Sequence, residues 1–280
     1  MLNNKTVTSV DGIGLDVRTF GNPEGQPILF VHGFAQSLWC WQKQFSAPEL
    51  QSFHLVAFDM RGHGRSDKPD FAAAYQSSEV WAGDVAAVID GFALENPLAV
   101  FWSYSGLVLC DYLRRYGDEA LSGINFVSAR TKVGTPAAKE MSGTLFSDLV
   151  PGFCSTDVVR REAAVRLFLE NLTEDGIPDP DFYTMLGYNL AVPPHICAAM
   201  LDRQLDNDDV LKRSSVPTVI THGDHDNSVL PLMAKHHERI VPKAELSLWP
   251  NIGHAPFYED ADRFNAELAR FASRCFKLRK

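Results

Sequence analysis

The sequence lacks a cysteine framework. Its five cysteines are spread through 280 residues, are odd in number, and contain no C-x-x-C spacing. Disulfide-rich domains and structural zinc sites both need paired, closely spaced cysteines. The sequence therefore predicts reduced and mostly buried thiols, with no disulfide and no cysteine-based metal site.

Long apolar runs and clustered positive charge are also missing. No run of 18 apolar residues could span a bilayer, and the N-terminal MLNNKTVTSVDG lacks the apolar core of a secretory signal. The 26 Lys and Arg residues stand against 35 Asp and Glu, which gives a formal net charge of -9. Nucleic acids and anionic membranes recruit clustered basic residues. We therefore expect a cytoplasmic protein that binds neither nucleic acid nor membrane, while nothing in the sequence predicts an oligomeric state.

What the sequence does contain is a series of short apolar runs that turn residues separate. Continuous runs of this type are typical of strands buried on both faces, and helical patterns lie between them. Two earlier runs, 5–12 and 14–21, predict an antiparallel edge. The sequence therefore predicts an α/β fold with a mostly parallel, doubly wound sheet. The buried runs are PILFVHG (27–33), HLVAFDMRG (54–62), PLAVFWS (97–103), INFVSAR (124–130), PTVITHGD (217–224) and the later AELSLWP (244–250).

One stretch interrupts this alternation of strands and helices. From about residue 131 to residue 212 the sequence has helical segments and a Pro-rich loop, but no apolar strand. Roughly eighty residues are too many for one crossover, which needs only a few tens. We therefore predict a core made of residues 1–130 and 213–280, with residues 131–212 inserted as a helical cap.

Polar residues directly follow several of the buried strands. Functional groups gather beyond the carboxyl ends of strands in an open parallel sheet. Ser103 follows one strand, and His254 follows the last. Asp224 and Asp226 both follow the strand in between. A serine hydroxyl becomes nucleophilic when an imidazole takes its proton, and a carboxylate fixes the tautomer of that imidazole, so these residue types suit nucleophilic catalysis.

The segment THGDHD (221–226) also allows a metal-binding interpretation, because His222, Asp224, His225 and Asp226 are all possible ligands. Alternate side chains at a strand end point in opposite directions, however, and no further ligand cluster such as H-E-x-x-H is present. We therefore expect no metal site and no cofactor.

Four of these motifs, in this order, resemble the α/β-hydrolase superfamily, and in particular its small serine esterases and lactonase-like members with a helical cap. The H-G-x segment after a strand matches residues 32–34, and the nucleophile elbow matches residues 101–105. The G-x-x-D acid loop matches residues 223–226, and the late G-H pair matches residues 253–254. The resemblance covers nearly the whole chain and implies the α/β-hydrolase fold.

The resemblance also implies roles for individual residues. Ser103 would be the nucleophile, His254 the base and Asp226 the acid, since the G-x-x-D spacing favours it over the earlier aspartate. The backbone amides of Phe34 and Tyr104 would form the oxyanion hole.

Aromatic residues flank these motifs and are candidates for an apolar substrate pocket. They are Phe34, Trp39, Tyr104 and Phe257. For Trp39, packing in the core is an equally good interpretation.

The elbow departs from the G-x-S-x-G pattern of the family. It reads F-W-S-Y-S-G, so Ser105 fills the second small position, but Phe101 fills the first. A phenylalanine in this tight turn is expected to cost about 1 to 3 kcal/mol unless neighbouring side chains are trimmed. Three interpretations stay open: compensated packing with full activity, a displaced nucleophile, or an engineered substitution.

A serine at the elbow disfavours the haloalkane dehalogenase and epoxide hydrolase branches, which use an aspartate there. We expect a serine hydrolase that cleaves a small carboxylic ester, lactone or thioester through an acyl-enzyme on Ser103. One alternative is a cofactor-free lyase on the same fold, without an acyl-enzyme. Another is a weakly active or ligand-binding homologue whose elbow Phe101 has impaired.

Overall fold

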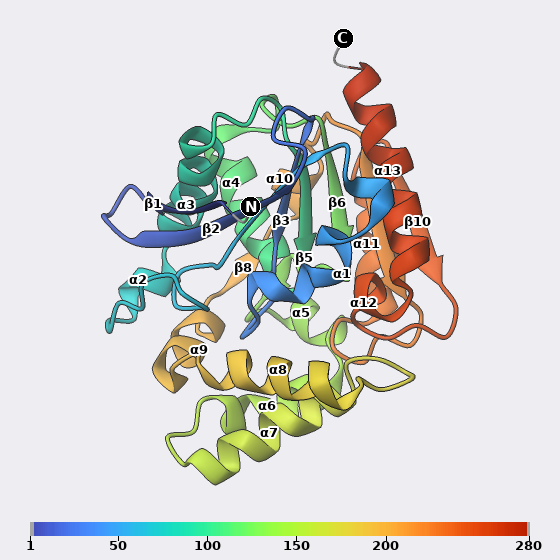
Figure 1. Ribbon diagram of the computed structural model, residues 1–280. Helices are drawn as coiled ribbons and strands as arrows, with labels where there is room; N and C mark the ends of the chain where they lie inside the picture. The colour runs from blue at the N-terminus through green and yellow to red at the C-terminus, as the bar shows by residue number, and fades with distance from the viewer. Residues whose placement is uncertain (1–2, 279–280) are drawn as a thin grey trace.

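The computed structural model describes residues 3–278, which are built around one eight-stranded sheet (Figure 1). The strand order is β1-β2-β4-β3-β5-β6-β9-β10. β1 runs antiparallel to β2, β2 runs antiparallel to β4, and the other neighbours are parallel. The predicted mostly parallel sheet with an antiparallel edge is therefore confirmed. The strands are β1 (Asn3–Thr8), β2 (Gly14–Gly21), β3 (Pro27–Val31), β4 (His54–Phe58), β5 (Leu98–Trp102), β6 (Gly123–Val127), β9 (Thr218–Gly223) and β10 (Ala244–Trp249).

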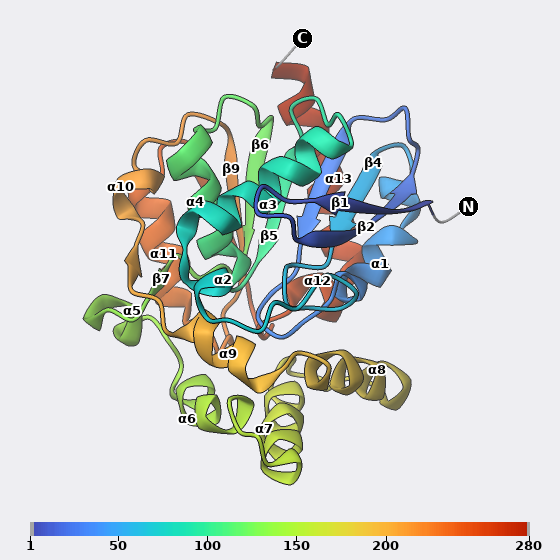
Figure 2. The same cartoon turned by 90° about the vertical axis from the view of Figure 1, so that its left-hand side faces the viewer.

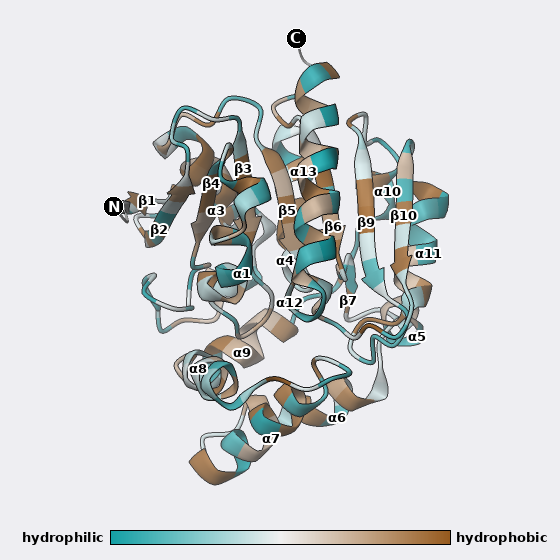
Figure 3. Ribbon diagram, turned by 45° about the vertical axis from the view of Figure 1, so that its right-hand side comes forward, coloured by the Kyte–Doolittle hydropathy of each residue, from teal (hydrophilic) through white to brown (hydrophobic). Residues whose placement is uncertain are grey.

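Helices cover both faces of this sheet, because its central strands are apolar on both sides. Every residue of β3, β5 and β6 is buried, and Figure 3 shows the central strands mostly in the hydrophobic colour. α3 (Ser78–Gly91) and α4 (Ser105–Tyr116) cover one face, and α1 (Gln42–Phe45) and α13 (Ala261–Leu278) cover the other. Further helices close to the sheet are the 3-10 helices Leu38–Trp41 and Pro48–Leu50, α2 (Ala73–Gln76), α10 (Asp208–Leu211), α11 (Pro231–Ile240) and α12 (Pro256–Glu259).

The segment between β6 and β9 places a group of helices beyond the carboxyl ends of the parallel strands (Figure 2). The expectation that it contains no buried strand is wrong in one detail, since the buried β7 (Lys132–Val133) pairs antiparallel with β8 (Leu205–Asp206). Two residues are too few to produce an apolar run. The division at residues 131 and 212 stays a prediction. In addition to α10, the helices of this segment are α5 (Pro136–Glu140), α6 (Thr144–Phe153), α7 (Val158–Glu170), α8 (Asp179–Leu190) and α9 (Pro194–Leu201).

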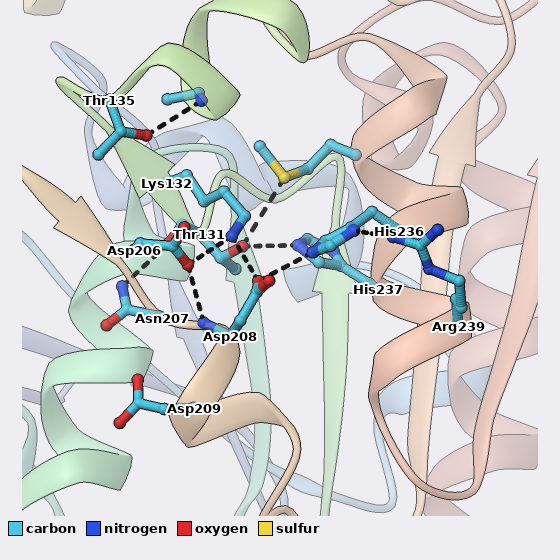
Figure 4. A network of polar contacts seen from close by, with 12 residues as sticks. Thr131, Lys132, Thr135, Asp206, Asn207, Asp208, Asp209, His236, His237 and Arg239 are labelled. Carbon is cyan, nitrogen blue, oxygen red and sulfur yellow. Dashed lines mark hydrogen bonds and ion pairs between the residues drawn. The ribbon is translucent and has the colours of Figure 1, made fainter.

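A buried lysine connects the start of this segment with its end (Figure 4). Lys132, whose side chain is almost fully buried, forms ion pairs with Asp206 and Asp208. Asp208 also contacts His236 of α11 at 2.8 Å. These contacts therefore connect β7, where the segment begins, with β8 and α10, where it ends, and with α11, which lies beside the sheet.

All five cysteines are unpaired, and four of them are buried. The prediction that these thiols are mostly buried is therefore confirmed. Across residues 3–278, each helix is too short or too polar to cross a membrane.

Candidate active site

Ser103 lies in a strained turn between β5 and α4. Its φ of 56° is in the left-handed region, which residues other than glycine rarely adopt. Backbone hydrogen bonds hold it there, since Ser103 N donates to Val127 O at 3.0 Å and Ser103 O accepts from Arg130 N at 2.9 Å. The turn therefore has the sharp strand-to-helix geometry of a nucleophile elbow.

Phe101 is fully buried inside β5, and the elbow forms beside it. The close approaches around Ser103 fall at two glycines. A Cβ on Gly33 would lie 3.1 Å from Ser103 Cβ, and a Cβ on Gly106 would lie 2.6 Å from the Arg130 carbonyl oxygen. The glycines at these two positions therefore supply the space that the turn requires.

The structure brings the three predicted triad residues together. His254 Nε2 lies 2.9 Å from Ser103 Oγ, and His254 Nδ1 lies 2.7 Å from Asp226 Oδ2. The competing Asp224 instead accepts a hydrogen bond from Asn251 N at the protein surface. The serine hydroxyl can therefore donate to one imidazole nitrogen while the other donates to a buried carboxylate.

Asp226 is held ionised by its surroundings. Its Oδ1 accepts hydrogen bonds from Ser228 N and Val229 N at 2.8 and 2.9 Å. Burial acts to raise the pKa of this carboxyl, but His254 and His222 outweigh it and hold the pKa well below its usual range. An ionised Asp226 can orient His254 and stabilise the imidazolium that forms when the imidazole takes a proton.

Two backbone amides flank the serine. Among the described residues, neither Phe34 N–H nor Tyr104 N–H donates a hydrogen bond to another protein atom. Tyr104 precedes α4, whose N-terminal dipole favours negative charge. The rings of buried His32 and His63 hydrogen-bond the backbone of the loop that carries Phe34. The two predicted oxyanion donors are therefore unpaired, and one stands on a braced loop.

A cavity of about 40 Å³ opens onto Ser103 and His254. The predicted pocket residues Phe34 and Tyr104 line it, as the sequence suggests. Most of its wall is apolar, and part comes from the helices between β6 and β9. The other lining residues are Gly33, Trp102, Arg130, Val133, Phe146, Phe168, Leu201 and Ser228.

Two predicted pocket residues lie elsewhere. Trp39 is 37% exposed and packs edge-on against Phe20 of β2 at 6.1 Å. Phe257 is buried against Trp41 and Trp102, with ring centroids 4.1 and 4.8 Å away. Neither residue is among those that line this cavity, because neighbouring residues of a loop or short helix point in different directions. Their contribution to a substrate pocket stays a prediction.

Several lining residues were not predicted from the sequence. Arg130 stands just beyond β6, so the rule that identified the other polar residues could have found it. Phe146 and Phe168 come from α6 and α7. Their contribution depends on how these helices pack over the sheet, for which the sequence carries no comparable signal.

The metal-binding interpretation of residues 221–226 finds no support in the geometry. Within residues 3–278, no group of three His, Cys, Asp or Glu side chains could hold a metal ion. Asp226 faces His254, and Asp224 is directed to a backbone amide.

The fold and the serine turn together define an α/β-hydrolase, and comparisons with known proteins agree. Residues 28–267 match the Alpha/beta hydrolase family, and the chain belongs to this family. It is similar to an esterase from Rhodococcus sp. ECU1013, with 36% identity, coverage of 96% of this chain and 98% of that one, and a TM-score of 0.89. It is also 26% identical over 256 residues to an AB hydrolase superfamily protein of Bacillus subtilis (strain 168), covering 89% of this chain and 92% of the relative. A non-heme chloroperoxidase of Kitasatospora aureofaciens is 26% identical over 283 residues, with 95% and 98% covered.

Three buried histidines predict that the protein loses stability in mild acid. Burial lowers the pKa of His32 to about 4 and the pKa values of His63 and His237 to about 3. In an unfolded chain these groups titrate near 6.5. The unfolded chain therefore binds more protons below about pH 6.5, so stability that is complete above this pH is lost as the pH falls toward the folded-state pKa values.

We expect the free energy of unfolding to fall by roughly 2 kcal/mol per histidine between about pH 7 and pH 5. Urea denaturation at several pH values measures this fall. A His195→Gln variant is the control, because His195 is exposed and its removal should leave the pH dependence unchanged. An unfolding free energy that stays constant over this range would contradict the prediction.

Proposed function

We propose that the protein is a serine hydrolase of small carboxylic esters, with Ser103 as nucleophile, His254 as base and Asp226 as acid. The observation that carries this proposal is the continuous hydrogen-bonded chain from Ser103 Oγ to His254 to Asp226. Lactones and thioesters present the same electrophilic carbonyl and would react by the same route.

In the first half of the reaction, Ser103 Oγ bonds to the carbonyl carbon while its proton passes to His254 Nε2. The carbonyl oxygen becomes negative and accepts hydrogen bonds from the amides of Phe34 and Tyr104, which contribute about 3 to 4 kcal/mol each. The tetrahedral intermediate then collapses. The leaving alkoxide takes the proton from His254, and an acyl group remains on Ser103.

In the second half, His254 takes a proton from a water molecule whose oxygen attacks the acyl carbon. The Ser103 oxygen departs with the proton from His254, which restores the serine and releases the acid. Asp226 stays ionised throughout and stabilises the imidazolium in both halves. The small, mostly apolar cavity favours short substrates.

Turnover of p-nitrophenyl acetate and butyrate, combined with mass spectrometry after a fluorophosphonate probe, tests this proposal. We expect hydrolysis of both esters and one probe adduct on Ser103. A lyase would catalyse its reaction without an acyl group on Ser103, whereas a ligand-binding homologue would give no turnover. Either result would contradict the proposal.

The likeness to a chloroperoxidase favours a second candidate, peroxide-dependent halogenation. Chlorination of monochlorodimedone in the presence of hydrogen peroxide and chloride measures it. Product formation that Ser103→Ala abolishes would support this activity in addition to ester hydrolysis.

A further inference from the structure

Arg130 is a buried cation in the cavity wall that has no anionic partner among the described residues. It is 8% exposed and lines the same cavity as Ser103 and His254. Its guanidinium makes two side-chain hydrogen bonds, to Ser142 Oγ and to the Ser228 carbonyl oxygen, and both acceptors are neutral. A guanidinium has five N–H donors, so three have no protein acceptor among the described residues.

Two other buried arginines of the chain each form an ion pair with a buried aspartate. Arg61 lies 2.7 Å from Asp84, and Arg203 lies 2.7 Å from Asp111. A buried charge costs free energy unless it is paired, so these contacts are the expected arrangement. Among residues 3–278, Arg130 has no such ion pair.

The charge on Arg130 persists despite burial. Burial lowers the pKa of its guanidinium to about 10, while the charge of Asp226 acts in the opposite direction. Arg130 is therefore cationic at neutral pH. Asp226 already accepts hydrogen bonds from two backbone amides and faces two histidines, so it is not free to pair with Arg130.

We propose that Arg130 binds a carboxylate of the substrate, so that the preferred esters are small molecules carrying a carboxylate close to the reacting carbonyl. This inference rests on the proposed function, whose substrate class it specifies. A guanidinium presents parallel N–H donors that match the two oxygens of a carboxylate. The surrounding apolar wall of the small cavity leaves little water to compete for them.

Two matched pairs of esters test the proposal. Monoethyl succinate and ethyl butyrate differ only in a terminal carboxylate on the acyl side. O-Acetylglycolate and ethyl acetate differ in the same way on the alcohol side. The wild-type protein should prefer the charged member of at least one pair, as acid release in a pH-stat will measure.

In Arg130→Met, kcat/KM for the preferred charged ester should fall by about 100-fold, mainly through KM, because charge-assisted hydrogen bonds are lost. The loss for its neutral counterpart should be at least tenfold smaller. Arg130→Lys should fall in between, since lysine keeps the charge without the planar pair of donors. Arg213→Met is the control, because Arg213 is exposed on the surface and should leave the preference unchanged.

Two outcomes would overturn the proposal. The first is that the wild-type protein shows no preference for the charged member of either pair. The second is that Arg130→Met lowers kcat/KM equally for both members, which would mean that Arg130 only braces the segments around Ser142 and Ser228.

If no ester is hydrolysed, the proposed function fails and succinate binding decides separately. A rise in Tm with succinate, but not with butyrate, that Arg130→Met abolishes would retain the carboxylate site. No rise would remove it.

Discussion

Replacement of Ser103 by alanine is expected to lower kcat/KM for p-nitrophenyl acetate by about 10,000-fold and to abolish the fluorophosphonate adduct. The reason is the position of its hydroxyl, 2.9 Å from His254 Nε2. Without that oxygen no acyl-enzyme forms, and only the oxyanion amides and the general electrostatics of the cavity remain to assist water.

The fold should survive this substitution. Alanine removes one oxygen atom, and the backbone hydrogen bonds of Ser103 to Val127 and Arg130 do not involve the side chain. Circular dichroism and Tm therefore separate loss of chemistry from loss of structure. Ser273→Ala is the matched control, because Ser273 is exposed on α13 and should leave both turnover and labelling intact. A Ser103→Ala protein that keeps most of its turnover would contradict the assignment of the nucleophile.

The sheet could be predicted from the sequence because the apolar residues of its central strands themselves indicate that these strands are buried. Segments such as PILFV and LAVFW are apolar at every position, which suits a strand with helices on both faces. The pairing of β7 with β8 could not be predicted in this way. It depends on Lys132 meeting Asp206 and Asp208, which lie more than seventy residues away in the chain.

The polar part of the candidate site followed from a topological rule, while its apolar part did not. Ser103, Asp226 and His254 each stand just beyond a strand, and parallel strands bring such positions to one edge. The wall of the cavity depends instead on side-chain directions. Phe257 turns into the core and Phe146 reaches the cavity from α6, and nothing in either local pattern distinguishes the two.

The geometry around Phe101 indicates whether its ring obstructs the elbow or is accommodated beside it. If its ring obstructed the turn, the backbone of Ser103 or the imidazole of His254 would be displaced. Instead Ser103 has the left-handed φ of an elbow, and its hydroxyl lies within hydrogen-bond distance of His254. The phenyl ring is fully buried in the core, so its removal would leave a cavity that the surroundings fill only in part.

Phe101→Gly is therefore expected to destabilise the protein by about 3.5 to 6 kcal/mol without raising its activity. About 3 to 5 kcal/mol comes from the cavity, and glycine in a strand interior adds roughly 0.5 to 1 kcal/mol. Urea denaturation of Phe101→Gly, Phe101→Ala and Phe126→Ala measures these terms. Phe126 is the matched control, because it is a buried neighbour of Phe101 in β6 and lies outside the elbow.

The activity of the same variants decides between the two interpretations. An accommodated ring predicts that kcat/KM for p-nitrophenyl acetate stays level or falls in Phe101→Gly, because the loosened strand holds Ser103 less firmly against His254. An obstructing ring predicts a clear rise together with stronger probe labelling, and that result would overturn our interpretation. Phe101→Leu keeps most of the buried volume and provides the same comparison if the glycine variant does not fold. Because leucine removes the aromatic ring at a smaller cost in packing, unchanged activity in Phe101→Leu would show that the elbow does not depend on the shape of the side chain at this position.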